Sequence, residues 1–131
     1  MSLTVGSKGK AETVVTEQNT AAAVGSGLVP VFATPYMIAL MENAAVNAVQ
    51  AQLEEGQGTV GTKLEVTHDA ATPVGMKVWA EAELTAVEGK KLTFAVKAFD
   101  EAGAIGGGTH ERFIITVDRF LAKAEAKKGG K

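Results

Sequence analysis

The sequence predicts an α+β fold in which a curved antiparallel sheet of about five strands wraps around one long central helix. The first observation behind this prediction is a glycine-free stretch at about residues 35–54 that is apolar on nearly every side, as expected of a buried helix. The second is a change to strict alternation of apolar and polar residues after residue 59, which is the period of a strand. One strand, one buried helix and four further strands in chain order predict a single core.

The composition limits the class of protein. The 131 residues suffice for one domain, 1–131, and no repeat or linker divides them. A net charge of −2 with scattered basic residues gives no basic patch for nucleic acid. We expect neither a membrane span nor a signal peptide, because no apolar run approaches the roughly 18–20 residues of a span. The absence of cysteine excludes disulfides, two histidines do not predict a metal site, and the expected compartment is the cytoplasm.

The chain before the long helix should contain a loose end, a short strand and a loop. Residues 1–10 are rich in Gly, Ser and Lys and are expected to be loose. The sequence AETVVTEQ (11–18) is typical of a short strand. The following NTAAAVGSGLVPVFATP (19–35) is built from small residues and broken by two prolines, which predicts a loop able to cover a pocket.

The long helix has clear start and stop signals. Thr34 before Pro35 combines an N-cap hydroxyl with a proline at the first helical position. The residues up to about 54 are strong helix formers, and GQG (56–58) ends the helix.

Four strands should follow, and their ranges are 60–68, 74–88, 92–99 and 109–117. The glycine-rich GAIGGG (103–108) lies between two strands and does not open a helix, so we expect a flexible hairpin loop and no phosphate-binding loop. The segment DRFLAKAEAKK (118–128) predicts a short C-terminal helix capped by Asp118, and residues 127–131 a second loose end.

Three residues are candidates for chemistry. Glu42 interrupts an apolar helix, where a carboxylate either belongs to a polar seam or is paired at a site. Thr34 caps the helix, and a helix N-terminus also favours developing negative charge. His68 ends the apolar face of the strand 60–68, either as a core histidine bonded to a carbonyl or as a proton shuttle between a hydroxyl and a carboxylate.

The spacing of these residues limits how they act together. Thr34 and Glu42 are separated by about 12 Å along a helix that rises about 1.5 Å per residue, so they cannot hydrogen-bond each other within one chain. An imidazole bonded at both nitrogens would bridge the gap, or a second subunit would supply one of the residues. The sequence leaves both arrangements open.

Two further residues have a structural and a functional interpretation. Gly61 lies on the strand that carries His68, and is either a bulge or packing glycine or the donor of a backbone N–H that polarises a carbonyl. His110 and Arg112 share one strand face in THERF (109–113). They form either a solvated strand end or, through the Arg112 fork, a site for an anionic or phosphate-bearing ligand.

Several of these motifs together resemble the hotdog-fold thioesterases, and within them the fluoroacetyl-CoA thioesterase group. The resemblance runs from about residue 12 to 118 through VGSGLVPVFATP, the helix with its Glu, EGQGTVGTKLEVTHDAATPVG and GGGTHERFII. It implies a homodimer with pockets at the interface, or a larger assembly of such dimers, that hydrolyses an acyl-CoA thioester. Coenzyme A would be part of the substrate, and no separate cofactor or metal would be needed.

The resemblance also implies roles for individual residues. Thr34, Glu42 and His68 would be catalytic, and the Gly61 N–H would contact the thioester carbonyl. Arg112 would help to place the acyl group or the coenzyme. The segment before the helix forms a hydrophobic lid in this group, and the residues that would serve as that lid here are Val24, Leu28 and Phe32.

Two other functions remain to be distinguished from hydrolysis. A hotdog lyase such as an enoyl-CoA hydratase would use an acid–base pair on the same scaffold, but Thr34 and Gly61 would then lose their roles. A non-catalytic acyl-CoA-binding protein would bind without turnover, and the intact Thr34, Glu42 and His68 set counts against it.

Overall fold

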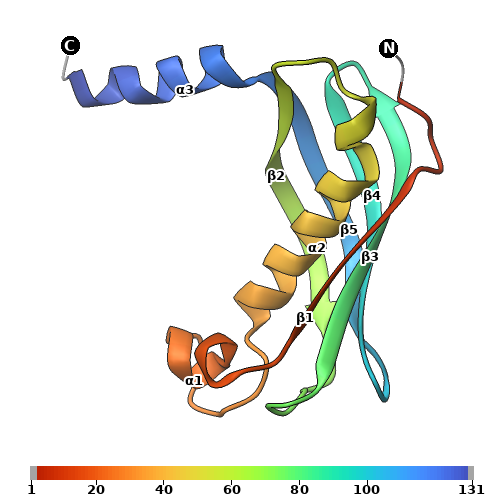
Figure 1. Cartoon of the computed structure of the whole chain (residues 1–131), viewed down its shortest axis with the longest axis vertical. Coiled ribbons are helices and arrows are strands. Elements are labelled where there is room, and N and C mark those ends of the chain that lie inside the picture. Colours follow the sequence, from red (N-terminus) through yellow and green to blue (C-terminus); the bar gives the residue numbers. More distant parts are fainter. Residues whose placement is uncertain (1–2, 130–131) are drawn as a thin grey trace.

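The computed structural model describes residues 3–129 and contains a five-stranded antiparallel sheet curved around one long helix (Figure 1). The strand order is β1-β3-β4-β5-β2, which leaves β1 and β2 at the two edges. The strands are β1 (Lys8–Val14), β2 (Gln57–His68), β3 (Lys77–Glu88), β4 (Lys91–Asp100) and β5 (Gly103–Thr116). This architecture confirms the predicted α+β fold.

The central helix α2 (Thr34–Val49) continues as a short 3₁₀ turn, η2 (Gln50–Gln52), close to the predicted range. It packs against β1 and β3, and its buried residues are Met37, Leu40, Met41, Ala44, Ala45, Ala48 and Val49. The alanines allow the sheet to approach closely. A Cβ at Gly9 of β1 would collide with the α2 backbone at Ala44 and Ala48, so the edge strand lies directly on the helix because it has no side chain there.

The segment before α2 is folded at the end of the sheet where β2 finishes (Figure 1). It contains a 3₁₀ turn, η1 (Glu17–Asn19), and a one-turn helix, α1 (Ala21–Val24). Isolated bridges pair Thr20 with Phe32 and Val31 with Pro73. The predicted loop therefore carries short helices and is attached to the body by backbone hydrogen bonds.

The glycine-rich residues 103–108 are not a hairpin loop, which corrects the prediction. They form the first part of β5 and pair with β4 on one side and β2 on the other. A Cβ at Gly106 would collide with the Thr67 carbonyl, and one at Gly108 with the Glu65 carbonyl. Glycine is needed here because β2 and β5 approach each other more closely than a side chain permits.

Both predicted helix caps are wrong. The N-cap of α2 is Ala33, and Thr34 is the first helical residue, with its hydroxyl directed away from the helix backbone toward β2. The C-terminal helix α3 (Val117–Glu125) has Thr116 at its N-cap, because β5 runs into α3 without an intervening loop, and Asp118 lies in the first turn.

The two ends of the chain are more ordered than predicted. Residues 8–10 belong to β1 and pair with β3, and residues 127–129 lie in the 3₁₀ turn η3 (Ala126–Gly129) that follows α3. Residues 1–2 and 130–131, which were also expected to be loose, lie outside the described residues. Within residues 3–129, none of the helices has the length and apolar character that crossing a bilayer requires.

Candidate active site

The structure places Thr34 and His68 side by side. Thr34 opens α2 and His68 closes β2, and the Thr34 Oγ1 lies 2.7 Å from the His68 Nδ1. The pair faces a cavity of about 290 Å³ beside the segment that precedes α2. The other residues that line this cavity are Ala21, Ser26, Gly27, Val29, Val31, Phe32, Asp69, Ala70 and Ala71. A hydroxyl and an imidazole therefore meet at the wall of a small cavity with few charged groups.

His68 is suited to accept a proton at one nitrogen only. Burial lowers its pKa below the ordinary value, although the backbone of Ala70 and the charge of Asp69 oppose this shift. The imidazole is consequently neutral at pH 7. Its Nε2 is buried and has no hydrogen-bond partner among residues 3–129, so Nδ1 is the nitrogen that contacts Thr34.

A second polar cluster surrounds Arg112, which is almost completely buried on β5. Its Nε donates to the Thr59 Oγ1 (2.8 Å) and its NH2 to the Thr59 carbonyl (2.9 Å). Its NH1 lies 3.5 Å from the Glu42 Oε2 in a salt bridge. Burial lowers the pKa of Arg112 and Glu42 opposes this shift, but a guanidinium stays charged in proteins. Arg112 thus places a fixed positive charge beside Glu42, whose side chain is 37% exposed.

His110 completes this cluster, and the sequence-based interpretation of a solvated strand end is wrong for it. The side chain is fully buried against Phe94, at 6.1 Å between ring centroids. Its Nδ1 donates to the Lys63 carbonyl at 2.9 Å, because a carbonyl only accepts, and this leaves Nε2 to accept from the Arg112 NH1 at 3.2 Å. Burial, and next the charge of Arg112, lower the pKa of His110, against the Lys63 hydrogen bond and the Glu42 charge.

Gly61 brings the backbone of β2 up against Glu42. A Cβ at this position would collide with the Glu42 Oε2 and would lie 3.2 Å from the His110 Cε1 and 3.3 Å from the Arg112 NH1. The pairing of β2 with β5 shifts register between Gly61 and Lys63, so the predicted irregularity of this strand is present. The absent side chain is therefore a requirement of the cluster.

The two clusters are separate within one chain. Thr34 and Glu42 lie about 12 Å apart along α2, and the unpartnered His68 Nε2 shows that no imidazole bridges them. Of the proposed lid residues, Phe32 is buried and lines the cavity of Thr34 and His68. Val24 and Leu28 are exposed and do not line it.

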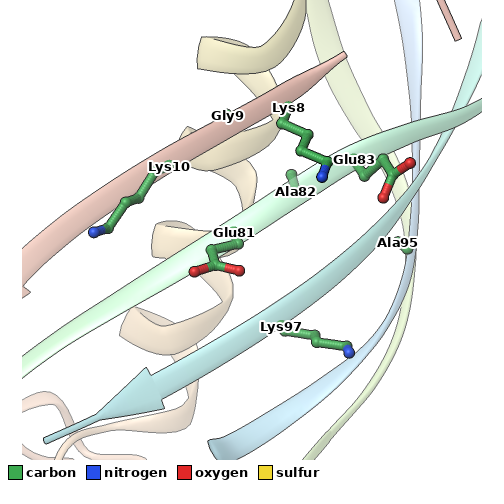
Figure 2. A pocket seen from close by; sticks show the side chains of 8 residues that line it. All are labelled: Lys8, Gly9, Lys10, Glu81, Ala82, Glu83, Ala95 and Lys97. Carbon is green, nitrogen blue, oxygen red and sulfur yellow. The ribbon is translucent and has the colours of Figure 1, made fainter. Parts of the chain in front are cut away.

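A larger hollow of about 520 Å³ lies elsewhere, on the outer face of β1, β3 and β4 (Figure 2). Its charged residues alternate in sign across neighbouring strands. In the strand register, Lys10 lies opposite Glu81, Glu81 opposite Lys97, and Lys8 opposite Glu83. The opposite charges offset one another, and the hollow has neither a histidine nor a hydroxyl. Among residues 3–129, no group of three or more His, Asp or Glu side chains could hold a metal ion.

Comparison with known proteins identifies the family. Residues 15–118 match the family described as fluoroacetyl-CoA-specific thioesterase. This chain belongs to that family. It is 50% identical over 97 residues to the fluoroacetyl-CoA thioesterase of Streptantibioticus cattleyicolor. The aligned residues make up 74% of this chain and 70% of that relative.

Solved structures agree with this assignment. A structure of the fluoroacetyl-CoA thioesterase FlK is 40% identical, superposes with a TM-score of 0.90, and covers 97% of this chain and 98% of its own. A thioesterase superfamily member from Thermus thermophilus is 30% identical, with a TM-score of 0.87 and coverage of 99% and 98%. A hot-dog-like protein from Thermanaerovibrio acidaminovorans is 25% identical, with a TM-score of 0.85 and coverage of 97% and 94%. The predicted hotdog fold is confirmed.

Proposed function

We propose that this protein hydrolyses the thioester bond of an acyl-CoA and releases a free acid and CoA. The acyl group is short or compact, and fluoroacetyl is the first candidate because the 50% identical relative is named for it. The observation that carries the proposal is the 2.7 Å contact between the Thr34 hydroxyl and the neutral His68 imidazole beside a small cavity. A hydroxyl bonded to a neutral imidazole is the arrangement that activates oxygen for attack on a carbonyl.

His68 would act as the base through Nδ1. With Nε2 protonated, the Nδ1 lone pair accepts the proton of the Thr34 hydroxyl as that oxygen attacks the thioester carbonyl. The C–S bond then breaks, and the imidazolium returns the proton to the departing thiolate. Water hydrolyses the acyl-threonine ester with the same histidine as base. Thr34 lies in the first turn of α2, where the helix dipole stabilises the developing negative charge.

A direct route would use Thr34 and His68 to orient and deprotonate a water molecule instead. The two routes separate in a rapid-quench experiment, since only the first accumulates an acyl group on the protein. Replacing Thr34 by alanine abolishes the covalent route, whereas serine retains it. Either substitution leaves the His68 Nδ1 available to water, so the size of the loss in Thr34→Ala measures the share of the covalent route.

Glu42, Arg112 and Gly61 would act on the carbonyl side of the reaction. Arg112 is held by Thr59 and His110, and its ion pair with Glu42 holds that carboxylate over Gly61. At that place the Glu42 carboxylate would accept a hydrogen bond from the hydrolytic water and orient it, while His68 takes the proton. The Gly61 N–H would donate to the oxyanion, where a preorganised donor is worth roughly 10²–10³ in rate.

We further propose that a homodimer joins the two clusters. β2 is an edge strand, and antiparallel pairing of two β2 edges around a two-fold axis would extend the sheet. If the axis passes between Leu64 and Glu65, His68 of one protomer lies opposite Gly61 of the partner subunit. Each active site would then combine Thr34 and His68 of one chain with the Glu42 cluster of the other.

The decisive experiment measures release of CoA thiol from fluoroacetyl-, acetyl-, butyryl-, longer-chain and aromatic acyl-CoAs. His68→Ala and Glu42→Gln should each lower kcat/KM by at least about 100-fold. Thr85→Ala is the matched control, because this exposed threonine on β3 likewise donates to a strand carbonyl, that of Thr93, and lies away from the β2 edge. Normal turnover in both Glu42→Ala and His68→Ala proteins would refute the proposed mechanism.

The same measurement distinguishes the other functions. Hydration of crotonyl-CoA without thiol release would indicate a lyase, and binding by calorimetry without turnover would indicate an acyl-CoA-binding protein. The cytoplasmic location expected from the cysteine-free sequence, and any larger assembly of dimers, stay predictions for fractionation and sedimentation experiments.

A further inference from the structure

Two exposed apolar surfaces are left uncovered by the rest of residues 3–129. The first, the lid patch, consists of Val24, Leu28 and Val29 in the segment before α2, where Leu28 is 96% exposed. The second, the α3 patch, consists of Val117, Phe120 and Leu121 on the C-terminal helix. Large apolar side chains gathered in this way usually mark an interaction surface.

The two patches lie at opposite ends of the same strand. The lid patch is at the His68 end of β2, where the cavity of Thr34 and His68 opens. The α3 patch is at the other end, because Gln57 pairs with Thr116, the residue before α3. Figure 1 shows α1 near the bottom of the molecule, below the start of α2, and α3 at the top.

Helix α3 extends beyond the β2 edge and leaves the body of the protein (Figure 1). The Val117 N–H donates to the Gly56 carbonyl at 2.9 Å, and no residue of α3 is buried. Its 9 residues span about 14 Å, which is roughly three strand spacings. The helix therefore overhangs the space that a second copy would occupy if it paired along β2.

A two-fold axis perpendicular to the sheet exchanges the two ends of β2. It brings the lid end of one copy to the α3 end of the other, on the same face of the joined sheet. We propose that α3 of each protomer lies across the lid patch of the partner subunit and closes the cavity that holds Thr34 and His68. This inference rests on the dimer proposed above, and it assigns the partner's Phe120 and Leu121 to the acyl pocket.

Charge supports a second copy as the occupant. The segment formed by α3 and η3 carries four basic residues, Arg119, Lys123, Lys127 and Lys128, against two acidic ones, Asp118 and Glu125. The lid end carries Glu17 and Asp69, and neither residues 11–35 nor residues 64–76 contain a lysine or arginine. Apolar residues meet apolar residues and basic residues meet acidic ones in this arrangement, which is the complementarity that an interface needs.

The contact would also serve the reaction. Leu28 and Val29 are exposed beside the cavity of about 290 Å³, so a helix resting on them would cover its entrance. When Phe120 and Leu121 of the partner subunit cover this segment, bulk water is excluded from the thioester. This exclusion matters because water in the site weakens the electrostatic stabilisation of the oxyanion. The partner's helix would consequently influence which acyl groups fit.

The absence of cysteine allows a clean crosslinking test of the full chain. Leu28→Cys and Phe120→Cys are introduced together, and the protein is treated with a short bismaleimide. We expect covalent dimers from the double variant, in which position 28 of one protomer lies near position 120 of the partner subunit. Neither single variant should crosslink, because the same position in the two protomers is far apart. The control pair combines Leu28→Cys with Val87→Cys, an exposed valine near the end of β3, and should give no dimer.

The functional arm uses Phe120→Ala with Leu121→Ala. We expect a several-fold rise in KM for short acyl-CoAs, with kcat less affected and the dimer retained in sedimentation. A dimeric, active protein that neither crosslinks nor changes KM would overturn the α3 contact and leave the proposed function intact. A monomeric protein would overturn the contact together with the dimer. A crosslinked dimer without hydrolysis would overturn the proposed function alone.

Discussion

Replacing Gly61 by alanine should abolish most of the activity while leaving the protein nearly as stable. The new Cβ would collide with the Glu42 Oε2 and would lie 3.2 Å from the His110 Cε1 and 3.3 Å from the Arg112 NH1. The colliding atom is the end of a flexible side chain that is 37% exposed, so the carboxylate can swing away toward solvent. We therefore expect a stability loss of about 1 kcal/mol, at the low end of the range for overpacking.

The loss of activity should be much larger. Relieving the collision moves the carboxylate by about 1 Å, and a misplacement of that size costs roughly 100-fold in rate, or about 2.7 kcal/mol of transition-state stabilisation. The assay is CoA thiol release, compared with the thermal unfolding midpoint, where 1 kcal/mol corresponds to about 4 °C.

Gly58→Ala is the matched control on the same strand. Its Cβ would make an ordinary contact with the Val117 Cγ2 at 3.5 Å, and the change restricts the unfolded chain equally. Its kcat/KM should stay within about twofold of the original, an effect of about 0.4 kcal/mol. Undiminished kcat/KM in a folded Gly61→Ala protein would refute the argument that the contact of Glu42 with the β2 backbone positions it for catalysis.

Three further outcomes are expected. His110→Gln keeps an acceptor near the Arg112 NH1, whereas His110→Asn keeps only the donor to the Lys63 carbonyl, so kcat/KM should be higher in the Gln variant. Burial lowers the pKa of His68 and of His110, so the unfolded chain binds more protons than the folded one at mildly acidic pH. The free energy of unfolding should therefore fall as the pH drops below about 6.5, and it should fall less steeply in His110→Gln. Urea titrations at several pH values measure this dependence. Gly108→Ala should lower stability by about 3 kcal/mol in thermal melts, more than Gly103→Ala, because only the first meets the β2 backbone at Glu65.

The sequence predicted those elements whose signals are local. The period of two in β3 and β4 and the unbroken run of helix formers in α2 depend on neighbouring residues only, and both were confirmed. The strand character of residues 103–108 could not be predicted, because it depends on how closely β2 approaches β5. A glycine run is typical of a flexible loop until the opposing backbone is known.

The candidate site divides in the same way. The pairing of a hydroxyl with His68 follows from the chemistry of the residue types, and the structure brings Thr34 to it. The burial of His110 could not be predicted, because THERF looks solvated in sequence and only the cross-strand neighbour Phe94 and the Lys63 carbonyl show otherwise. The one available signal was that His110 lies on the same strand face as Arg112.

The distribution of polar groups along α2 explains why an edge strand matters to the chemistry. One helix carries the hydroxyl at its first residue and the carboxylate two turns later, so a substrate carbonyl cannot touch both within one chain. His68 of β2 lies beside Thr34, and Gly61 of the same strand lies beside Glu42, so β2 borders both clusters and ends the sheet. In the proposed dimer, a two-fold operation on that edge would bring each hydroxyl to the opposite carboxylate, and the same operation would carry α3 over the lid patch. The proposed dimer would therefore explain the open edge, the separated clusters and the two exposed apolar patches together.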